Sequence, residues 1–197
     1  IARKLVHEIK NPLTPIRLSA ERIQKRYGEK HQDLDSIVMT GTATIIDEVN
    51  TLMEIIGEFS RFARLPEMKP ERGDINEKIT SCANFFLGNE RIEFHLALDE
   101  KAPQMYFDRI LIRQAMTNLI QNAVDSIKDR GNIWIGTSLV TAQQRAMLRI
   151  SVKDDGAGIR EEDLQRIFEP TFSSKEHGTG LGLAIVEKIV FEHKGRI

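Results

Sequence analysis

The chain has 197 residues, of which 41% are hydrophobic, so it can build one medium domain or two small ones, each with its own core. Its formal net charge of −1 argues against a nucleic-acid backbone or an anionic membrane as the main partner. The single cysteine, Cys82, excludes a disulfide within the chain and suits a reducing compartment. Because its neighbours follow a helical pattern, we expect Cys82 to be a buried structural thiol.

The ends of the chain suggest a piece of a longer protein. The chain begins at Ile1 without a methionine, already in a helical pattern, and ends at GRI, where we expect a strand to begin. No apolar run reaches the roughly 20 residues of a membrane span, and the longest candidate, GLGLAIVEKIVF, is broken by charge. Any membrane anchor is therefore expected in segments that precede this chain.

Two long helices are predicted first, joined by the short polar link GEKHQD. Their apolar residues recur at steps of three and four, which is the spacing of a heptad seam. The seam consists of Leu5, Ile9, Pro12, Ile16, Ala20, Ile23 and Tyr27, then of Leu34, Val38, Gly41, Ile45, Val49, Leu52, Ile56, Phe59 and Ala63. The short link predicts an antiparallel hairpin. Because one hairpin covers its seam poorly, we expect a homodimeric four-helix bundle; the alternative is a hairpin packed on the rest of the chain.

The stretch LPEMKPERGD shifts the composition to proline, glycine and charge, and Pro66 and Pro70 end the second helix. We therefore expect a helical hairpin over residues 1–65, a linker over 66–73 and a second domain over 74–197.

The second domain mixes helices and strands. Helices are predicted over residues 75–87, 109–130, 161–167 and 181–193, and strands over 91–98, 104–107, 132–139 and 146–154. This order predicts an α+β two-layer sandwich, with helices on one face of a single sheet.

Two glycine-rich segments of this domain are candidates for ligand binding. DDGAG contains Asp154, Gly156 and Gly158, and its glycines let the backbone approach a ligand while a carboxylate can accept from an exocyclic amine. A calcium loop or a plain turn would look similar. GTGLGL opens the last helix, where backbone N–H groups can face an anion, although a flexible loop is the alternative. No strand precedes it, so it differs from the dinucleotide fingerprint.

The segment NLIQNAVDS places Asn118 and Asn122 four residues apart, on one face of the predicted helix. An amide oxygen is a suitable ligand for Mg²⁺ that is held mostly by phosphate and water. A structural hydrogen-bonding role is the alternative, because buried amides need partners.

Together and in this order, the three segments resemble the ATP-binding domain shared by histidine kinases, Hsp90-type chaperones, gyrase and MutL. NLIQNAVDS matches the N box, DDGAG the G1 box, IFEPTFSSK the F box and GTGLGL the G2 box. The resemblance implies ATP and Mg²⁺ as ligands, with Asp154 on the adenine amine, Asn122 on Mg²⁺ and residues 168–178 as a short lid. It places the phosphates along Gly178, Thr179, Gly180, Leu181 and Gly182. Lys175 would reach the terminal phosphate, or else be a solvated surface lysine.

Two positions separate branches of this superfamily. ATP-hydrolysing members carry a water-activating glutamate where this chain has Asn118, which has no carboxylate, so we expect phosphate to go to another acceptor. Many histidine kinases have a lysine where this chain has Asp125, so no phosphate contact is assigned to that position.

The acceptor is expected in HEIKNPLTP, which resembles the H box of sensor histidine kinases. His7 lies off the seam, toward solvent, and a neutral imidazole is a nucleophile near pH 7. Glu8 can accept from the second ring nitrogen and act as base, and the resemblance gives Asn11 a role in dephosphorylating the regulator. Pro12 cannot donate to the carbonyl of Glu8, nor Pro15 to that of Asn11, so the helix is weakened there, as a moving bend or as a static kink.

Within the histidine kinases, residues 1–28 and 58–71 resemble the nitrogen-regulation sensor kinases of the NtrY type. That resemblance implies autophosphorylation on His7, transfer to an aspartate of an NtrX-like response regulator, and the cytoplasmic part of a sensor anchored in the bacterial inner membrane. Regulator phosphatase activity is a further implied function. The alternatives are an ATPase switch on the same fold, and a non-catalytic dimerisation and docking module.

Overall fold

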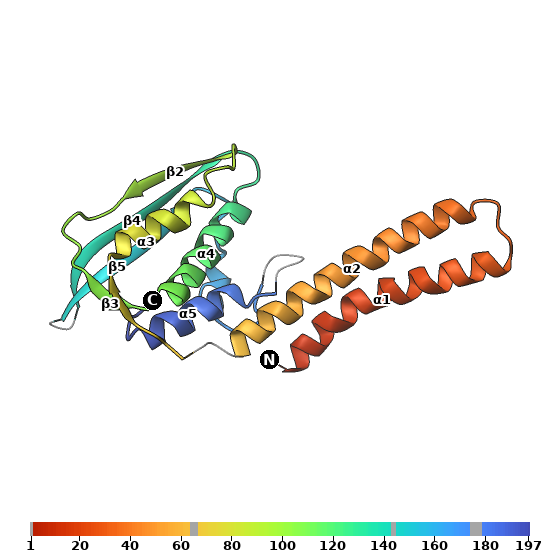
Figure 1. The fold of residues 1–197 in the computed structure, drawn as a ribbon, viewed down its shortest axis with the longest axis horizontal. Helices are drawn as coiled ribbons and strands as arrows, with labels where there is room; N and C mark the ends of the chain where they lie inside the picture. Colours follow the sequence, from red (N-terminus) through yellow and green to blue (C-terminus); the bar gives the residue numbers. More distant parts are fainter. Residues whose placement is uncertain (1, 64–66, 143–144, 174–178) are drawn as a thin grey trace. The chain divides into compact units, whose positions relative to one another are not determined.

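A computed structural model describes residues 2–63, 67–142, 145–173 and 179–197 (Figure 1). The chain divides into two compact units, Ile1–Leu65 with Pro170–Leu181, and Pro66–Glu169 with Gly182–Ile197, which are described separately below. The division into hairpin, linker and second domain that the sequence suggested stays a prediction. No helix among the described residues is both long and apolar enough to cross a lipid bilayer.

The predicted helical hairpin is confirmed. Helix α1 (Ala2–Gly28) lies beside helix α2 (Leu34–Ala63), with residues 29–33 between them (Figure 1). Helix α1 ends in a Schellman motif, in which the His31 N–H donates to the Arg26 carbonyl and the Lys30 N–H to the Tyr27 carbonyl. Lys30 takes the left-handed conformation, with φ 51°, that glycine usually supplies. The helices approach closely at Gly41, where a Cβ would lie 2.8 Å from Cδ1 of Ile23.

The hairpin has a narrower seam than the sequence predicted. Among its described side chains only Pro12 and Ile55 are buried, and Tyr27, Val49 and Ile56, which were assigned to the seam, are exposed. The exposed apolar residues of α2 recur at heptad spacing and form a second stripe, defined here as Met39, Ile46, Val49, Met53 and Ile56. The hairpin of one chain therefore leaves an apolar face uncovered.

The second unit alternates helices and strands. Its elements are β1 (Glu71–Gly73), α3 (Ile75–Asn84), β2 (Ile92–Ala97), β3 (Met105–Phe107), α4 (Arg109–Ser126), β4 (Gly131–Ala142), β5 (Arg145–Asp154), the 3₁₀ turn η1 (Glu161–Asp163) and α5 (Gly182–Glu192). Helix α4 is shorter than predicted because Ile127 leaves the helix with an extended ψ of 111°. The helix expected over residues 161–167 is reduced to η1, and residues 195–197, where a strand was expected to begin, are irregular.

The strands form two sheets, where one was predicted. Strand β4 is central in the larger sheet, parallel to β2 and antiparallel to β5, so the predicted hairpin of two strands is confirmed. Strands β1 and β3 form a separate antiparallel pair. Strand β1 was not predicted, because the three residues Glu71–Gly73 carry no apolar alternation and are fixed by their pairing with β3.

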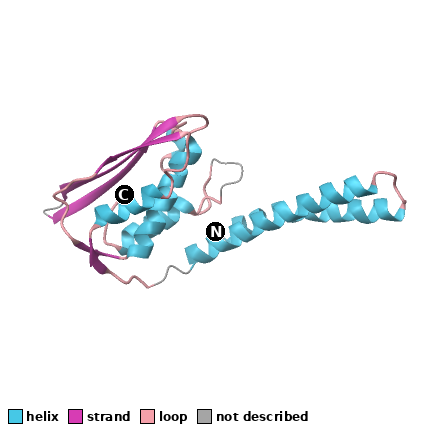
Figure 2. Ribbon diagram, turned by 45° about the horizontal axis from the view of Figure 1, so that its top comes forward, coloured by secondary structure: helices cyan, strands magenta, loops and turns pink. Residues whose placement is uncertain are grey.

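Helices α3, α4 and α5 lie on one face of the larger sheet, as expected for the sandwich (Figures 1 and 2). Alternation along β4 explains the layering, because Ile133 and Ile135 are buried while Trp134 between them is 38% exposed. Met116 and Ile120 of α4 join the same core. Cys82 is buried as predicted, and burial raises the pKa of its thiol.

Candidate nucleotide site and phosphoacceptor helix

Asp154 lies at the end of β5 and is held by two donors. The hydroxyl of Ser126 donates to its Oδ1 at 2.7 Å, and the Gly156 N–H donates to the same oxygen at 3.0 Å. Ser126 is the last residue of α4, so the carboxylate is fixed between the end of a helix and its own loop. The side chain is half-buried, which suits a group that accepts a hydrogen bond from a ligand at the edge of a core.

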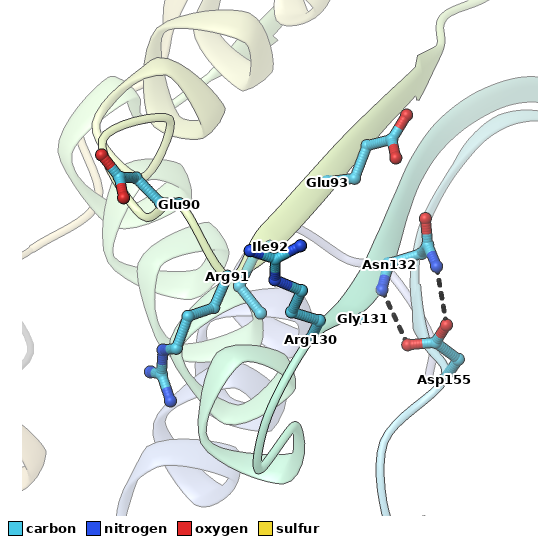
Figure 3. Close-up of a pocket in the computed structure, with 8 residues that line it drawn as sticks. All are labelled: Glu90, Arg91, Ile92, Glu93, Arg130, Gly131, Asn132 and Asp155. Carbon is cyan, nitrogen blue, oxygen red and sulfur yellow. Dashed lines mark hydrogen bonds between the residues drawn. The ribbon is translucent and has the colours of Figure 1, made fainter.

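The neighbouring carboxylate, Asp155, is used differently. Its Oδ1 accepts from the backbone N–H of Asn132 at 2.7 Å and its Oδ2 from Nδ2 of Asn132 at 2.8 Å (Figure 3). The side-chain and backbone N–H groups of Asn132 lower the pKa of Asp155. Asp155 therefore joins the segment after β5 to β4, and the two adjacent aspartates have separate roles.

The glycines of this loop have separate reasons to be glycine. A Cβ on Gly156 would lie 2.0 Å from Oγ and 2.7 Å from the carbonyl carbon of Ser126, so no side chain fits there. Gly158 has φ +70°, and a Cβ on it would meet no atom within 4 Å, so its conformation and not crowding favours glycine.

The two asparagines of α4 lie at the start of α5. Nδ2 of Asn118 donates to the Gly182 carbonyl at 3.1 Å. A Cβ on Gly182 would come within 4.0 Å of the side chains of both Asn118 and Asn122. Because eight residues of α-helix rise about 12 Å, α4 separates Asn118 from Ser126 by that distance. One helix therefore carries a polar group beside α5 and another beside the Asp154 loop.

Asn122 fits a magnesium ion whose other ligands come from phosphate and water. Its amide is half-buried, and Nδ2 would lie 4.0 Å from a Cβ on Gly182, at the start of α5. Among the described residues, no group of three or more His, Cys, Asp or Glu side chains could hold a metal ion by itself. A divalent ion at Asn122 would thus depend on oxygens that a nucleotide brings.

The described part of the glycine segment before α5 belongs to the other unit. Its Gly180, with φ +63°, accepts from the Thr171 N–H at 2.9 Å, and a Cβ on it would lie 2.4 Å from the Phe172 carbonyl oxygen. The Leu181 N–H donates to Thr179 Oγ1 at 3.4 Å, and Leu181 is buried. Lys175 and Gly178, both predicted phosphate-binding residues, lie outside the described residues.

The predicted phosphoacceptor lies on α1. His7 and Asn11 are exposed and Glu8 is half-buried, so the expectation that His7 faces solvent agrees with the structure. The helix continues through both prolines, with Pro12 buried and Pro15 half-buried. Thr14 Oγ1 donates to the carbonyl of Lys10 at 3.3 Å. The prolines thus interrupt the pattern of backbone donors within α1 but do not end it.

Comparison with known proteins places both parts of the chain in one family. Residues 1–67 match the model of the His Kinase A (phospho-acceptor) domain, and residues 107–197 match the model of the histidine kinase-, DNA gyrase B- and HSP90-like ATPase. A crystal structure of the catalytic domain of histidine kinase ThkA is 33% identical over 62% of this chain and 80% of that chain, with a TM-score of 0.55. The chain belongs to the histidine kinases.

Similar proteins include a nitrogen regulation protein and a sensory histidine kinase/phosphatase. Nitrogen regulation protein NtrY of Azorhizobium caulinodans is 37% identical over 100% of this chain and 26% of its own length. Sensory histidine kinase/phosphatase NtrB of Rhodobacter capsulatus is 34% identical over 100% of this chain and 57% of its own length. ThkA in complex with response regulator protein TrrA aligns with a TM-score of 0.71 at 28% identity, over 98% of this chain and 55% of that chain. This histidine kinase sequence thus spans about a quarter to somewhat over half of these curated relatives.

Two polar residues of this histidine kinase were missed in the sequence. Nothing in the segment NLIQNAVDS indicates that Ser126 contacts Asp154, because the two residues lie 28 positions apart in the chain. Asp108 caps α4 by accepting from the N–H groups of Ile110 and Leu111, and its Oδ2 accepts from the Lys69 N–H at 2.8 Å. Its own N–H donates to Nε2 of His193 at 3.0 Å. An aspartate directly before an amphipathic run was the available signal for the cap.

A depression of about 400 Å³ lies elsewhere on the second unit of the histidine kinase, at the start of β2 and β4 (Figure 3). Its walls carry charges of both signs and contain none of the residues predicted to bind nucleotide. The lining residues are Glu90, Arg91, Ile92, Glu93, Arg130, Gly131, Asn132 and Asp155. We assign it no part in nucleotide binding.

Proposed function

We propose that this histidine kinase transfers the γ-phosphoryl group of ATP to the imidazole of His7 and then to an aspartate of a response regulator. In the first step a P–O bond to ADP breaks and a P–N bond to His7 forms; in the second the phosphoryl group passes to a carboxylate oxygen. The observation that supports this most is the arrangement along α4, which carries Asn118 and Asn122 beside Gly182 at one place and Ser126 beside Asp154 at another. One helix can thus contact both ends of a nucleotide.

In this proposal the second unit positions the nucleotide. Asp154 accepts a hydrogen bond from the adenine amine, and Gly156 and Gly158 let the backbone approach the base. Asn122 ligates Mg²⁺, which neutralises charge on the phosphates when it is bound. Gly178, Thr179, Gly180, Leu181 and Gly182 line the phosphates, and Lys175 adds a positive charge. Phosphoryl transfer needs mainly such positioning and charge compensation.

The residues around His7 supply the acceptor chemistry. An exposed imidazole on a helix can be reached by a nucleotide-bearing domain, and Glu8, next to it, accepts the proton of the second ring nitrogen. Asn11 follows His7 by one helical turn and would position water for dephosphorylating the regulator. The likeness to NtrB, a sensory histidine kinase/phosphatase, supports this second activity.

Asn118 favours transfer to histidine over hydrolysis. In the structure its amide donates to the Gly182 carbonyl, and an amide has no basic oxygen that could activate water at the rate of a glutamate. The competing function, an ATPase switch, would show steady phosphate release without any protein partner. A non-catalytic docking module, the other alternative, would bind no nucleotide.

The proposed assembly is a homodimer with a response regulator as partner. The exposed second stripe on α2 supports association of two hairpins into a four-helix bundle. The likeness to ThkA in complex with TrrA supports a regulator as phosphate acceptor, and the likeness to nitrogen regulation protein NtrY supports nitrogen regulation with an NtrX-like regulator. We further propose that the chain is the cytoplasmic part of an inner-membrane-anchored sensor, and that the segment 66–73 lets the domains meet.

The experiment is incubation with γ-labelled ATP and Mg²⁺. We expect label on the protein that is labile in acid and stable in base, as a phosphoramidate is, and we expect His7→Gln to abolish it. His31→Gln is the matched control, because His31 lies in the loop of the same hairpin and its ring accepts only from the Asp33 N–H in the part of the chain that the structure describes. Label that survives in His7→Gln would refute the assignment.

A further inference from the structure

We propose that Ser126 is the positioning residue that orients the carboxylate of Asp154 and thereby sets the preference of this site for a base with an amino group. The inference rests on the proposed function, since it concerns the base of the nucleotide that Asp154 would bind. Ser126 itself does not touch the base in this proposal; it acts through Asp154.

The two oxygens of Asp154 are not equivalent. Both donors, Ser126 Oγ at 2.7 Å and the Gly156 N–H at 3.0 Å, bind Oδ1. Among the described residues, no hydrogen bond is made to Oδ2. Two donors on one oxygen fix the plane of the carboxylate, so the second oxygen is presented in one direction to accept from a ligand.

Ser126 is well placed to hold this geometry because it is itself fixed. Its carbonyl, one of those that a helix end leaves without an intrahelical donor, accepts from the Ala157 N–H at 3.1 Å. The missing side chain of Gly156 lets the loop lie directly against Ser126. The loop after β5 is therefore attached to the end of α4 at the side chain, at the backbone and by close packing.

The hydroxyl has one proton and two acceptors in range, Asp154 Oδ1 at 2.7 Å and the Ala123 carbonyl at 2.8 Å. A charged acceptor forms the stronger hydrogen bond, so the proton is directed to the carboxylate. Asp155 provides the contrast, since each of its two oxygens accepts a hydrogen bond from Asn132, whereas Asp154 accepts both of its hydrogen bonds at Oδ1.

The test compares two nucleotides on the same folded protein. Dissociation constants of the whole 197-residue chain are measured with Mg²⁺ for ATP and for purine riboside triphosphate, which lacks the 6-amino group. We expect Ser126→Ala to weaken ATP binding about tenfold, because a hydrogen bond to a charged group is lost. We expect the affinity for purine riboside triphosphate to change by less than about twofold, because this nucleotide has no amine that could donate to Asp154.

Two further variants sharpen the test. Ser151 lies on β5, the strand that ends in Asp154, and among the described residues its hydroxyl donates only to the Gly136 carbonyl, at 3.4 Å. Ser151→Ala should therefore leave both affinities unchanged. In the background of Asp154→Asn, Ser126→Ala should weaken ATP binding by much less than in the parent chain, because residues that act as a unit are not additive.

The ratio of the two affinities separates positioning from folding, since a loss of folded protein would weaken both nucleotides equally. Equal weakening of both nucleotides, or unchanged ATP binding in Ser126→Ala, would overturn the inference while the proposed function stands. A parent chain that binds no ATP would overturn the proposed function and the inference with it.

Discussion

The two parts of this histidine kinase bury their apolar residues in different ways. In the hairpin, among described side chains, only Pro12 and Ile55 are buried, and the second stripe of α2 faces outward. In the sandwich, a continuous core runs from α3 through α4 to the sheet, and residues such as Ile79, Ile120 and Ile133 have no exposed surface. The sandwich therefore completes its core within one chain, whereas the hairpin needs another surface.

This difference suits the two halves of the proposed reaction. A nucleotide site needs polar groups fixed to a rigid core, as Asp154 is fixed through Ser126 and Gly156. A phosphoacceptor needs to be reached in turn by a nucleotide domain and by a regulator, and His7 is exposed on a helix with two prolines. We expect a substitution that disturbs the packing of one part to leave the folding and binding properties of the other part unchanged.

The largest expected effect is on assembly of the hairpin. Ile46 is 60% exposed in the middle of the second stripe, and Ile46→Glu would bury an unpaired charge in a dimer interface. We expect this change to cost about 3–5 kcal/mol of dimer stability. Sedimentation equilibrium should show monomers, while nucleotide binding by the sandwich stays the same.

Thr40→Glu is the control for this variant. Thr40 is exposed on α2 but lies outside the second stripe, so the chain should remain dimeric. A dimer that tolerates Ile46→Glu as well as Thr40→Glu would show that the second stripe is not the interface.

The next effect in size should be confined to the sandwich. Gly156→Ala places a Cβ against both the side chain and the backbone of Ser126, and we expect this crowding to cost about 1–3 kcal/mol and to displace Asp154. Calorimetry should show weakened ATP binding with unchanged dimerisation. Gly88→Ala, where a Cβ meets no atom within 4 Å, should leave both properties intact; ATP binding that survives Gly156→Ala would contradict the assigned loop geometry.

A smaller effect is expected at Asp108, where the chain entering the sandwich is attached to α4. Asp108→Ala removes the cap of α4 and the acceptor of the Lys69 N–H, and should destabilise the sandwich by about 1–2 kcal/mol in denaturant unfolding. The helical content of the hairpin should not change. Loss of hairpin structure in this variant would show that the two parts do not behave independently.

The carboxyl of Asp108 also makes the stability of the sandwich depend on pH. Burial alone would raise the pKa of Asp108, but the N–H groups of Leu111, Lys69 and Ile110 and the nearby His193 outweigh burial and lower it. A lowered pKa in the folded state contributes stability above the unfolded value of about 4, which is lost as the pH falls through the lower folded value. Asp108→Asn should reduce the loss of sandwich stability as the pH falls below about 4. An unchanged acid profile would contradict this contribution.

The sequence predicted the parts of the fold that rest on long periodic patterns. Spacing by three and four predicted α1 and α2, and alternation predicted the pairing of β4 with β5. The four-residue spacing of Asn118 and Asn122 predicted a shared face, and both lie beside Gly182. Local periodicity is sufficient for such features because each is set by one helix or one strand.

What the sequence did not predict depends on contacts between distant segments. The resemblance singled out Asp154, but the contacts that hold it to Ser126, and the neighbouring Asp155 to Asn132, are seen only in the structure. Strand β1 forms through pairing with β3. Lys30 adopts a left-handed conformation that glycine usually takes, so its residue type gave no sign of it. The second stripe of α2 also required the structure, because heptad spacing alone does not tell which face of a helix packs within its own hairpin.

The most direct test of the account is to locate the phosphoryl group after incubation of the chain with ATP and Mg²⁺. The protein is digested at alkaline pH, where phosphohistidine survives, and the phosphopeptides are sequenced by mass spectrometry. We expect the phosphate on the peptide that contains His7, on the histidine itself. Phosphate on another residue, or ATP turned over to free phosphate with no phosphopeptide at all, would contradict it.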